Sequence, residues 1–297
     1  MVVSHNEGAR LRSTVDNLLA TLPAHSELIV VDDGSTDGSA EFLRTYPDVR
    51  VLRPRERLGS SLARNVGAAE VHGEVIVFSD AHVETDPGWA PILCSVLGDP
   101  RIGLAGPTIT ALGARAFKGY GMTIAPNPDV RRDDLLVPRW LYQRSAEPYA
   151  VPMLCGCFVA MRRDVLETCG GFDPGILQWG SEDAELSMRL WMLGYECVVV
   201  PEVEVAHQFR QRHGYHVEYA KVLHNMLRMA TVHFSEGRLA ALYATVADDP
   251  ALPAASELLS GSDAYRRRDA MRERRRFDDD WYFGGVCAAA NQLAGAG

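Results

Sequence analysis

The fold is decided by Glu74-Val-Ile-Val-Phe-Ser-Asp-Ala-His82, a run of apolar residues that ends in polar side chains. The apolar part, residues 75–78, predicts a buried strand of a mostly parallel sheet. Because side chains two residues apart in a strand point the same way, Asp80 and His82 converge just beyond its carboxyl end. Open α/β sheets bind ligands at that edge, and a carboxylate with an imidazole suits a divalent ion such as Mn²⁺. An aspartate that caps the next turn, beside a solvated histidine, explains the pair equally well.

Short apolar runs alternate with amphipathic segments on the N-terminal side of this stretch. We expect strands at residues 2–3, 28–31 and 49–52, and helices at residues 9–22, 39–45 and 60–71. Strands and helices that alternate at this spacing indicate βαβ units, so we predict an α/β fold in which helices flank a mostly parallel sheet.

The C-terminal side is less regular. Residues 103–151 are rich in glycine, proline and aromatic residues, and we expect an irregular segment that crosses the ligand face. Strands at residues 153–161, 196–200 and 203–206 and helices at residues 163–169 and 182–193 come next. The last part predicts an amphipathic helix at 217–234, a linker at 248–262, and a solvated arginine-rich helix at 266–276 that pairs with residues 278–280. We therefore divide the chain into an α/β domain, residues 1–215, and a helical extension, residues 216–297.

The composition excludes several classes of protein. A chain of 297 residues that is 47% hydrophobic and 23% charged is typical of a soluble globular protein. Its formal charge of −9 argues against a nucleic-acid partner. Six scattered cysteines predict reduced thiols in a cytoplasmic protein. We find no signal peptide and no run near the roughly 18 apolar residues of a membrane span. The chain opens so close to its first strand that this strand reads as clipped.

Two acidic pairs are candidates for ligand binding. Asp32 and Asp33 follow a buried strand, where adjacent carboxylates suit the N–H of a uracil ring and the hydroxyls of a ribose. The same turn could instead cap the helix that follows it. Glu182 and Asp183 open a helix beside Trp179, and an aromatic ring next to a carboxylate suits a sugar, although acidic residues are common in any first helical turn.

Basic and imidazole groups are the other candidates. His207 follows a strand and could be the third ligand of the same metal ion. Arg57 flanks the carboxyl edge of the sheet and could meet a diphosphate, whereas Arg64, inside a helix, could simply hold an acidic strand end. Three more residues lie in one polar loop that either closes over a diphosphate or is plain surface: Arg210, His213 and Tyr215.

Seven segments together carry a family resemblance. They are His5-Asn6-Glu7, Asp32-Asp33-Gly34-Ser35, Arg57-Leu58-Gly59, Asp80-Ala81-His82, Gly156-Cys157-Phe158, Trp179-Gly180-Ser181-Glu182-Asp183 and the run from His207 to Tyr215. In this order, residues 2–235 resemble the family 2 glycosyltransferases of GT-A fold, and in particular the polypeptide N-acetylgalactosaminyltransferases, which start mucin-type O-glycans.

The resemblance implies a fold, a cofactor and a set of site residues. It implies a GT-A fold with a helical C-terminal extension, a UDP-sugar as donor, and Mn²⁺ or Mg²⁺ as cofactor. Asp80, His82 and His207 would be the metal ligands. The catalytic residues would be Glu182, Asp183 and Arg210. The nucleotide sugar would be bound by Val3, His5, Glu7, Asp32, Asp33, Arg57, Asp80, Ala81, Gly156, Trp179, Glu182 and Tyr215.

The sequence also departs from the polypeptide N-acetylgalactosaminyltransferases. Their usual Glu-Asn is Glu182-Asp183 here, their His-Pro-Tyr is His213-Gly214-Tyr215, and cysteines flank Gly156. Asp183 stands where inverting family 2 enzymes keep a general base, so retention and inversion both stay open, with retention first. The secretory anchor and lectin domain of those enzymes have no counterpart in the sequence, which favours a cytoplasmic, bacterial enzyme.

We therefore expect transfer of a hexose or an N-acetylhexosamine from a UDP-sugar to a hydroxyl or thiol of a peptide or small-molecule acceptor. Two functions of another class stay open. One is a sugar nucleotidyltransferase, which would ordinarily need a glycine-rich basic loop near its N-terminus, and residues 4–8 are not such a loop. The other is an inactive module that binds a nucleotide sugar. The sugar, the acceptor and the oligomeric state do not follow from the sequence.

Overall fold

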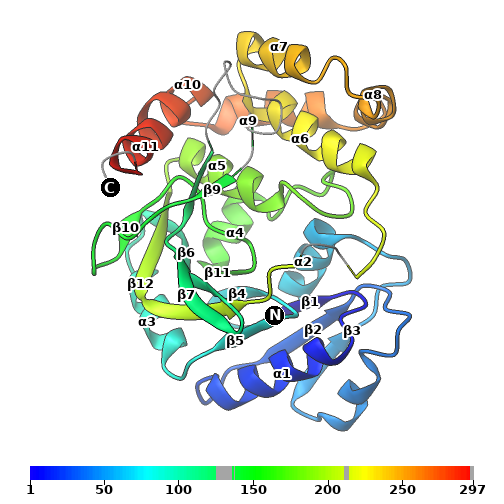
Figure 1. The fold of residues 1–297 in the computed structure, drawn as a ribbon, viewed down its shortest axis with the longest axis vertical. Coiled ribbons are helices and arrows are strands. Elements are labelled where there is room, and N and C mark those ends of the chain that lie inside the picture. The colour runs from blue at the N-terminus through cyan, green and yellow to red at the C-terminus, as the bar shows by residue number, and fades with distance from the viewer. Residues whose placement is uncertain (125–135, 137, 211–213, 295–297) are drawn as a thin grey trace.

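A computed structural model describes the chain except residues 125–135, 137, 211–213 and 295–297, and except the side chains of residues 292–294. At its centre lies a ten-stranded mixed sheet with helices on both faces, and the last helices gather at one side of the molecule (Figure 1). Eight strands form a continuous path in the order β10-β12-β6-β11-β4-β1-β2-β3, while β5 pairs with β12 and β7 pairs with β6.

The strands of this sheet follow the predicted alternation closely in the first half of the chain. They are β1 (Val2–Ser4), β2 (Leu28–Asp32), β3 (Val49–Leu52), β4 (Val75–Asp80), β5 (Val83–Thr85), β6 (Ile102–Ala111), β7 (Ala114–Gly119), β10 (Tyr149–Ala150), β11 (Phe158–Arg162) and β12 (Glu196–His207). Strands β1 to β4 are parallel to one another, and β11 runs antiparallel between β4 and β6. A separate pair is formed by β8 (Met122–Ile124) and β9 (Pro138–Trp140).

The helices cover the sheet in two layers and then form a third group. The helices of the first two layers are α1 (Ala9–Thr21), the 3₁₀ helix η1 (Glu41–Thr45), α2 (Ser60–Ala69), α3 (Trp89–Val96), α4 (Arg163–Cys169) and α5 (Glu182–Leu193). The third group is α6 (Tyr219–His233), α7 (Glu236–Thr245), α8 (Leu252–Ser260), α9 (Ala264–Arg274), α10 (Asp279–Trp281), the π-helix η3 (Tyr282–Cys287) and α11 (Ala288–Ala294).

Alternate residues of each central strand enter different cores. In β2, Val30 packs with α1 and α3, whereas Val31 packs with α2, α4 and α5 on the opposite face. This is the two-residue period that buries both faces of a parallel sheet. A third core joins the C-terminal helices to the α/β part, because Met188 of α5 packs with Leu227 of α6. The division at residue 215 stays a prediction, and α5 belongs to both of the cores that lie beside it.

The structure confirms the α/β class and corrects several expected elements. Strand β6 lies in the segment for which we expected no regular structure. Its Gly103 and Gly106 are packing positions, since a Cβ would come 2.7 Å from Tyr195 and 3.0 Å from Leu154. The strand expected from residue 153 begins at Phe158, and β12 is one strand with a register shift near Pro201. Helices α3 and α7 were not expected, and α8 lies in the segment for which we expected a linker with short helical pieces.

The expected pairing of the arginine-rich helix with residues 278–280 is wrong. Arg238 of α7 forms ion pairs with Asp279 and Asp280. The arginines of α9 and the residues after it instead donate to carbonyls where other helices end: Arg268 to Thr231 at 2.6 Å and Arg275 to His233 at 3.2 Å. A helix C-terminus carries partial negative charge, which explains this arrangement. Among the described residues, no helix is long and apolar enough to cross a lipid bilayer.

Candidate active site

A cavity of about 390 Å³ lies at the carboxyl ends of β1, β2 and β4, where the sequence predicted a ligand. Fifteen of the predicted site residues line it: Val3, His5, Glu7, Asp33, Arg57, Asp80, Ala81, His82, Gly156, Trp179, Glu182, Asp183, His207, Arg210 and Tyr215. Asp32 lies outside the lining. A larger cavity of about 950 Å³ opens at the opposite edge of the sheet, but none of the predicted site residues lines it, so we place the chemistry at the carboxyl edge.

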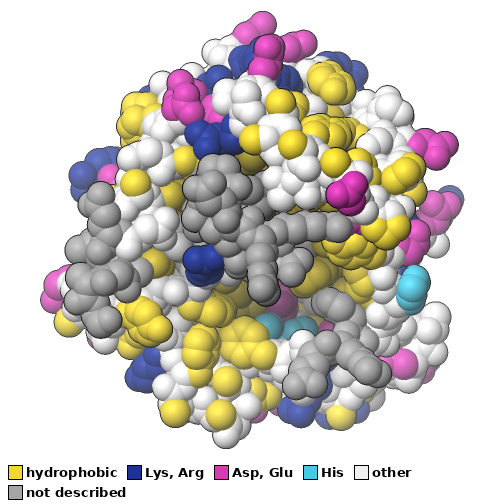
Figure 2. Space-filling model, turned by 45° about the horizontal axis from the view of Figure 1, so that its top comes forward, with side chains coloured by type: hydrophobic (Ala, Val, Ile, Leu, Met, Phe, Trp, Pro, Cys, Tyr) yellow, Lys and Arg dark blue, Asp and Glu magenta, His cyan; other side chains and the backbone are white. Residues whose placement is uncertain are grey.

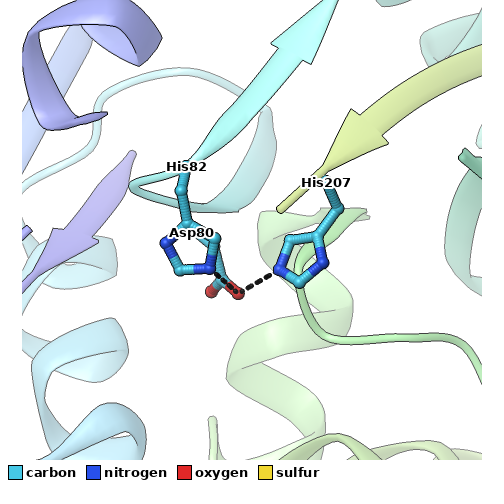
Figure 3. Close-up of side chains that lie close together, drawn as sticks. All are labelled: Asp80, His82 and His207. Atoms are coloured by element: carbon cyan, nitrogen blue, oxygen red, sulfur yellow. Dashed lines mark ion pairs between the residues drawn. The ribbon is translucent and has the colours of Figure 1, made fainter. Parts of the chain in front are cut away.

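Asp80, His82 and His207 come together as the sequence predicted (Figure 3). Their ligand atoms all lie within 4.8 Å of one another, and in the described part of the chain no other group of histidine, cysteine and acidic side chains meets that criterion. Asp80 Oδ2 is 3.4 Å from His207 Nε2 and 3.9 Å from His82 Nε2. Strand pairing produces this convergence, because β5 runs antiparallel to β12 with His207 opposite Val83.

The donor set fits a divalent cation. Within the described residues, neither ring nitrogen of His207 makes a hydrogen bond, although both are buried. Buried polar atoms are almost always hydrogen-bonded, so a ring whose closest polar contact is the 3.4 Å ion pair from Nε2 to Asp80 points to a missing partner. One carboxylate and two imidazoles suit Mn²⁺ and related ions. Burial alone would raise the pKa of Asp80, but His207, Arg64 and His82 hold that pKa well below its usual range, so the carboxylate is ionised and able to bind a cation.

Glu7 contacts one of these candidate ligands, His82, on the side away from Asp80. Its Oε2 lies 3.1 Å from His82 Nδ1, so Nδ1–H is the donor and Nε2 is left to face Asp80. The carboxylate also forms an ion pair with Arg210. Burial would raise the pKa of Glu7, but His82 and Arg210 outweigh it and lower the pKa. A carboxylate that orients a metal-binding histidine in this way is a common outer partner of metal sites.

Arg64 has a larger role than the sequence suggested. The side chain is buried and donates to Asp80 Oδ1 at 3.1 Å, to Glu182 Oε1 at 2.9 Å and to the carbonyl of Gly156 at 3.1 Å. One guanidinium therefore joins the metal-binding strand to the start of α5. Because Arg64 occupies Oδ1 of Asp80, Oδ2 is the oxygen that faces the histidines.

Asp32 and Asp33 are held by the protein itself. Arg53 forms an ion pair with Asp32 at 3.2 Å, and Asp33 accepts the backbone N–H groups of Leu58 and Gly59. The repulsion between adjacent carboxylates is therefore relieved without a ligand. Asp33 still faces the cavity, while Asp32 lies beneath it, so nucleotide binding by Asp32 stays a prediction.

Tyr215 closes one side of the cavity against the N-terminal loop. Its ring meets that of His5 edge-on with centroids 5.1 Å apart, and the guanidinium of Arg57 lies 4.5 Å from the ring centroid. Burial raises the pKa of Tyr215 to about 12, so the hydroxyl stays protonated. His213 lies outside the described residues.

Trp179 and the acidic pair of α5 form the opposite side. Trp179 is 40% exposed at the cavity, and Glu182 Oε2 accepts the N–H of Gly180 at 2.9 Å. Asp183 accepts the N–H groups of Gly156 and Ala184. Burial, and then the charge of Glu182, raise the pKa of Asp183 to about 6. Asp183 is thus a carboxyl group that exchanges protons near neutral pH.

Sequence reasoning missed an aromatic cluster at the mouth of this cavity. Phe117, Trp140 and Phe209 meet edge-on with centroids 5.6 to 6.0 Å apart, and Phe209 also packs against His207. Hydrophobic side chains adjoin histidines in a hollow of this face (Figure 2). The three residues come from separate parts of the chain, so spacing could not unite them. The signal available in the sequence was the number of aromatic residues in the irregular segment and in the polar loop.

Comparisons with known proteins agree with this geometry. The model described as "Glycosyl transferase family 2" matches residues 1–170, and the model described as "N-terminal domain of galactosyltransferase" matches residues 142–218. N-acetylgalactosaminyltransferase 7 of Drosophila melanogaster is 32% identical over 237 residues, which is 71% of this chain and 39% of that protein. Human polypeptide N-acetylgalactosaminyltransferase 15 is 31% identical over 248 residues, 76% of this chain and 38% of that protein. The chain thus spans about two fifths of the length of these relatives.

One solved structure shows the same fold. The crystal structure of GalNAc-T7 with UDP, GalNAc and Mn²⁺ superposes with a TM-score of 0.79 at 24% identity, over 99% of this chain and 57% of that chain. The likeness confirms the predicted GT-A architecture.

Proposed function

The chain belongs to glycosyl transferase family 2, and from this premise we propose that it is a metal-dependent glycosyltransferase with a UDP-sugar as donor. It would move a hexose or an N-acetylhexosamine to a hydroxyl or thiol of a peptide or small-molecule acceptor. The observation that carries the proposal is the group formed by Asp80, His82 and His207, in which neither ring nitrogen of His207 makes a hydrogen bond to a described residue. A related structure that contains UDP, GalNAc and Mn²⁺ supports the choice of donor and metal.

The metal side of the cavity suits a diphosphate. Asp80, His82 and His207 would hold Mn²⁺ or Mg²⁺, which when bound offsets the negative charge of a departing diphosphate. Arg210 carries a further positive charge at this side, and Glu7 fixes its position. The phenol of Tyr215 stays neutral beside them and adds no repulsion to an anionic ligand. The leaving group therefore needs no proton from these residues.

The opposite side suits the sugar of the donor. The exposed ring of Trp179 can pack on the C–H face of a pyranose, and Glu182 can accept sugar hydroxyls. Asp33 and Arg57 line the cavity beyond Val3 and would face the nucleoside. Each of these roles is a proposal that a single substitution tests.

The aromatic cluster bears on the acceptor. Phe117 is 38% exposed and Phe209 is 46% exposed, and Trp140 and Phe209 also line the cavity. Exposed aromatic groups at the mouth of a polar cavity favour an acceptor with an apolar part next to its reacting group. A peptide and a small natural product both meet this description.

Two stereochemical courses remain, and Asp183 separates them. Retention, in which the leaving UDP helps to take the acceptor proton, is our first choice. Inversion with Asp183 as general base is favoured by one observation, the pKa of about 6 that suits proton transfer near neutral pH. Asp183→Asn should keep turnover within about tenfold under retention. Under inversion it should lose the roughly 10²–10⁴-fold that a general base contributes. NMR of the product's anomeric configuration decides independently.

The proposal is tested by binding and by turnover. UDP should raise the melting temperature only when Mn²⁺ is present, because the diphosphate and the ion complete one site. A panel of UDP-sugars is then incubated with serine- and threonine-containing peptides and with phenolic glycoside acceptors, and UDP release is measured. UDP stabilisation that does not depend on the metal contradicts the metal assignment. Pyrophosphate formation from UTP and a sugar phosphate would indicate a nucleotidyltransferase, and binding without turnover an inactive module.

A further inference from the structure

The loop that presents Trp179 has an unusual backbone. We call residues 175–181 the Trp179 loop. Gln178 and Ser181 have φ values of 54° and 70°, and Gly180 has 97°. Left-handed conformations are strained at residues other than glycine, so they persist only where the surroundings enforce them. The Trp179 loop therefore depends on contacts from outside itself.

Asn225 of α6 supplies most of these contacts. The side chain is fully buried. Its Oδ1 accepts the N–H of Leu177 at 2.7 Å, and its Nδ2 lies 2.7 Å from the carbonyl of Leu177 and 3.1 Å from those of Trp179 and Gly180. Oδ1 also lies 3.1 Å from His224 Nδ1. Three carbonyls thus share the two amide hydrogens, and an amide is the one side-chain group that can both accept and donate in this way.

Other contacts fix the Trp179 loop at its edges. The carbonyl of Gln178 accepts the N–H of Ser60 at the start of α2. The side chain of Gln178 donates to the carbonyl of His216 and accepts the N–H of Glu218, just after Tyr215. At the end of the loop, Gly180 donates to Glu182. Asn225 is the contact that reaches the backbone on both sides of Trp179.

We infer that Asn225 is a positioning residue for sugar transfer. It holds the Trp179 loop in the conformation in which Trp179 and Glu182 face the cavity, so α6 contributes to the reaction without touching substrate. The inference rests on the proposed function, in which this side of the cavity binds the donor sugar. It predicts that loss of the amide impairs the handling of the sugar and leaves the metal and diphosphate side intact, since none of the hydrogen bonds that Asn225 makes to described residues goes to Asp80, His82 or His207.

The test compares Asn225→Leu and Asn225→Ser with the parent. The first variant keeps the branched shape of the side chain although it is larger than asparagine, and the second leaves room in case the first does not fold. Thr231→Val is the matched control, because Thr231 is equally buried on the same helix and its hydroxyl makes no hydrogen bond to any described residue. Three quantities are measured: amide hydrogen exchange at Leu177, affinity for UDP with Mn²⁺, and kcat and KM for UDP-sugar turnover.

We expect exchange at Leu177 to rise by about tenfold or more in both variants, because its N–H loses its acceptor. Affinity for UDP with Mn²⁺ should stay within about twofold of the parent, while kcat/KM for sugar transfer falls by roughly 10–100-fold, the range typical of misplaced binding groups. The control should match the parent in all three measurements.

Two results would overturn the inference. One is parental exchange at Leu177 in the variants, and the other is a parallel loss of UDP affinity and turnover, which indicates general loss of structure. If the parent itself neither binds UDP nor releases it from a UDP-sugar, the proposed function fails and the role in transfer fails with it. The exchange measurement then still decides whether Asn225 holds the loop.

Discussion

The two sides of the cavity differ in whether their polar groups are hydrogen-bonded within the protein. The metal side, formed by Asp80, His82 and His207, stands on strand ends, and among the described residues both ring nitrogens of His207 lack hydrogen bonds. The Trp179 loop has no regular structure, yet its backbone is bound by Asn225 of α6 and by Ser60 of α2. On the metal side, the ring nitrogens of His207 remain available to a ligand. On the Trp179 side, backbone polar groups of the loop are hydrogen-bonded, and these bonds fix its conformation. Substitutions on the two sides should therefore fail in different ways.

The largest effect is expected at the metal side from His207→Ala. Loss of one of three ligands should lower the affinity for UDP in the presence of Mn²⁺ by roughly a thousandfold, more than the 10–100-fold typical of an outer partner. The melting temperature without ligand should change little, because the imidazole makes no hydrogen bond to any described residue. Isothermal titration with UDP, with Mn²⁺ and with EDTA, measures both states. Exposed His72, replaced by Ala, is the control. Metal-dependent affinity that survives in His207→Ala refutes the site.

The Trp179 side should lose stability when the buried ion pair between Asp173 and Arg228 is broken. Asp173 is fully buried, binds Arg228 at 2.8 and 2.9 Å, and accepts the N–H of Gly175 at the start of the Trp179 loop. Asp173→Ala leaves a buried charge with one partner fewer and should lower the free energy of unfolding by about 3–5 kcal/mol. Urea unfolding measures this change. Glu41→Ala, which removes an exposed pair, should cost at most about 1 kcal/mol. Equal effects of the two substitutions would contradict the comparison.

Glu7→Gln tests whether the metal side depends on its outer partner. The amide keeps the shape of the side chain but loses the charge that orients His82 and holds Arg210. We expect affinity for Mn²⁺ to fall by about 10–100-fold. Electron paramagnetic resonance of free Mn²⁺ during a titration gives the affinity. Glu41→Gln, an exposed change of the same kind, should bind like the parent, and a match between the two variants would remove Glu7 from the site.

The last effect, on the pH dependence of stability, concerns Asp183, which lies on the same side of the cavity as Trp179. Burial, with the charge of Glu182, raises its pKa to about 6, whereas an unfolded aspartate titrates near 3.9. Between these values the folded state holds a proton that the unfolded state has released, so this group destabilises the fold as the pH rises from about 4 to about 7. Asp183→Asn does not titrate, so its unfolding free energy relative to the parent should rise by about 2–3 kcal/mol over that range and then stay constant. Urea unfolding at several pH values checks this slope, and a difference that does not change with pH contradicts it.

Local pattern was enough for the first half of the fold. Strands β2 and β4 and helix α1 begin where the apolar periodicity predicted, because that periodicity is set by residues within each element. It failed for β6, whose Gly103, Gly106 and Pro107 read as loop residues. Those glycines are required by Tyr195 and Leu154, which approach from distant parts of the chain. A residue chosen for a close tertiary contact cannot be recognised from its own neighbours.

The same limit applies to the site. Asp80 and His82 share one strand end, so spacing alone brings them together. The sequence motifs were enough to predict that Asp33 and Glu182 line the cavity. The hydrogen bonds of Arg64 to Asp80 and Glu182 could not be predicted in this way, because they join three separate elements. The aromatic cluster at the cavity mouth likewise depends on the packing of β7, β9 and the residues after β12.

By itself the sequence determined the α/β class and the edge of the sheet that bears the site, and it indicated Asp80 and His82 as candidate metal ligands. These follow from periods of two and 3.6 residues and from motifs within a few residues of one another. Only the tertiary structure decided that His207 reaches Asp80, through the antiparallel pairing of β5 with β12, and that Asn225 holds the Trp179 loop. The physical reason is separation along the chain. Periodicity reflects residues that are neighbours in the sequence, whereas a buried hydrogen bond can join residues that only folding brings together.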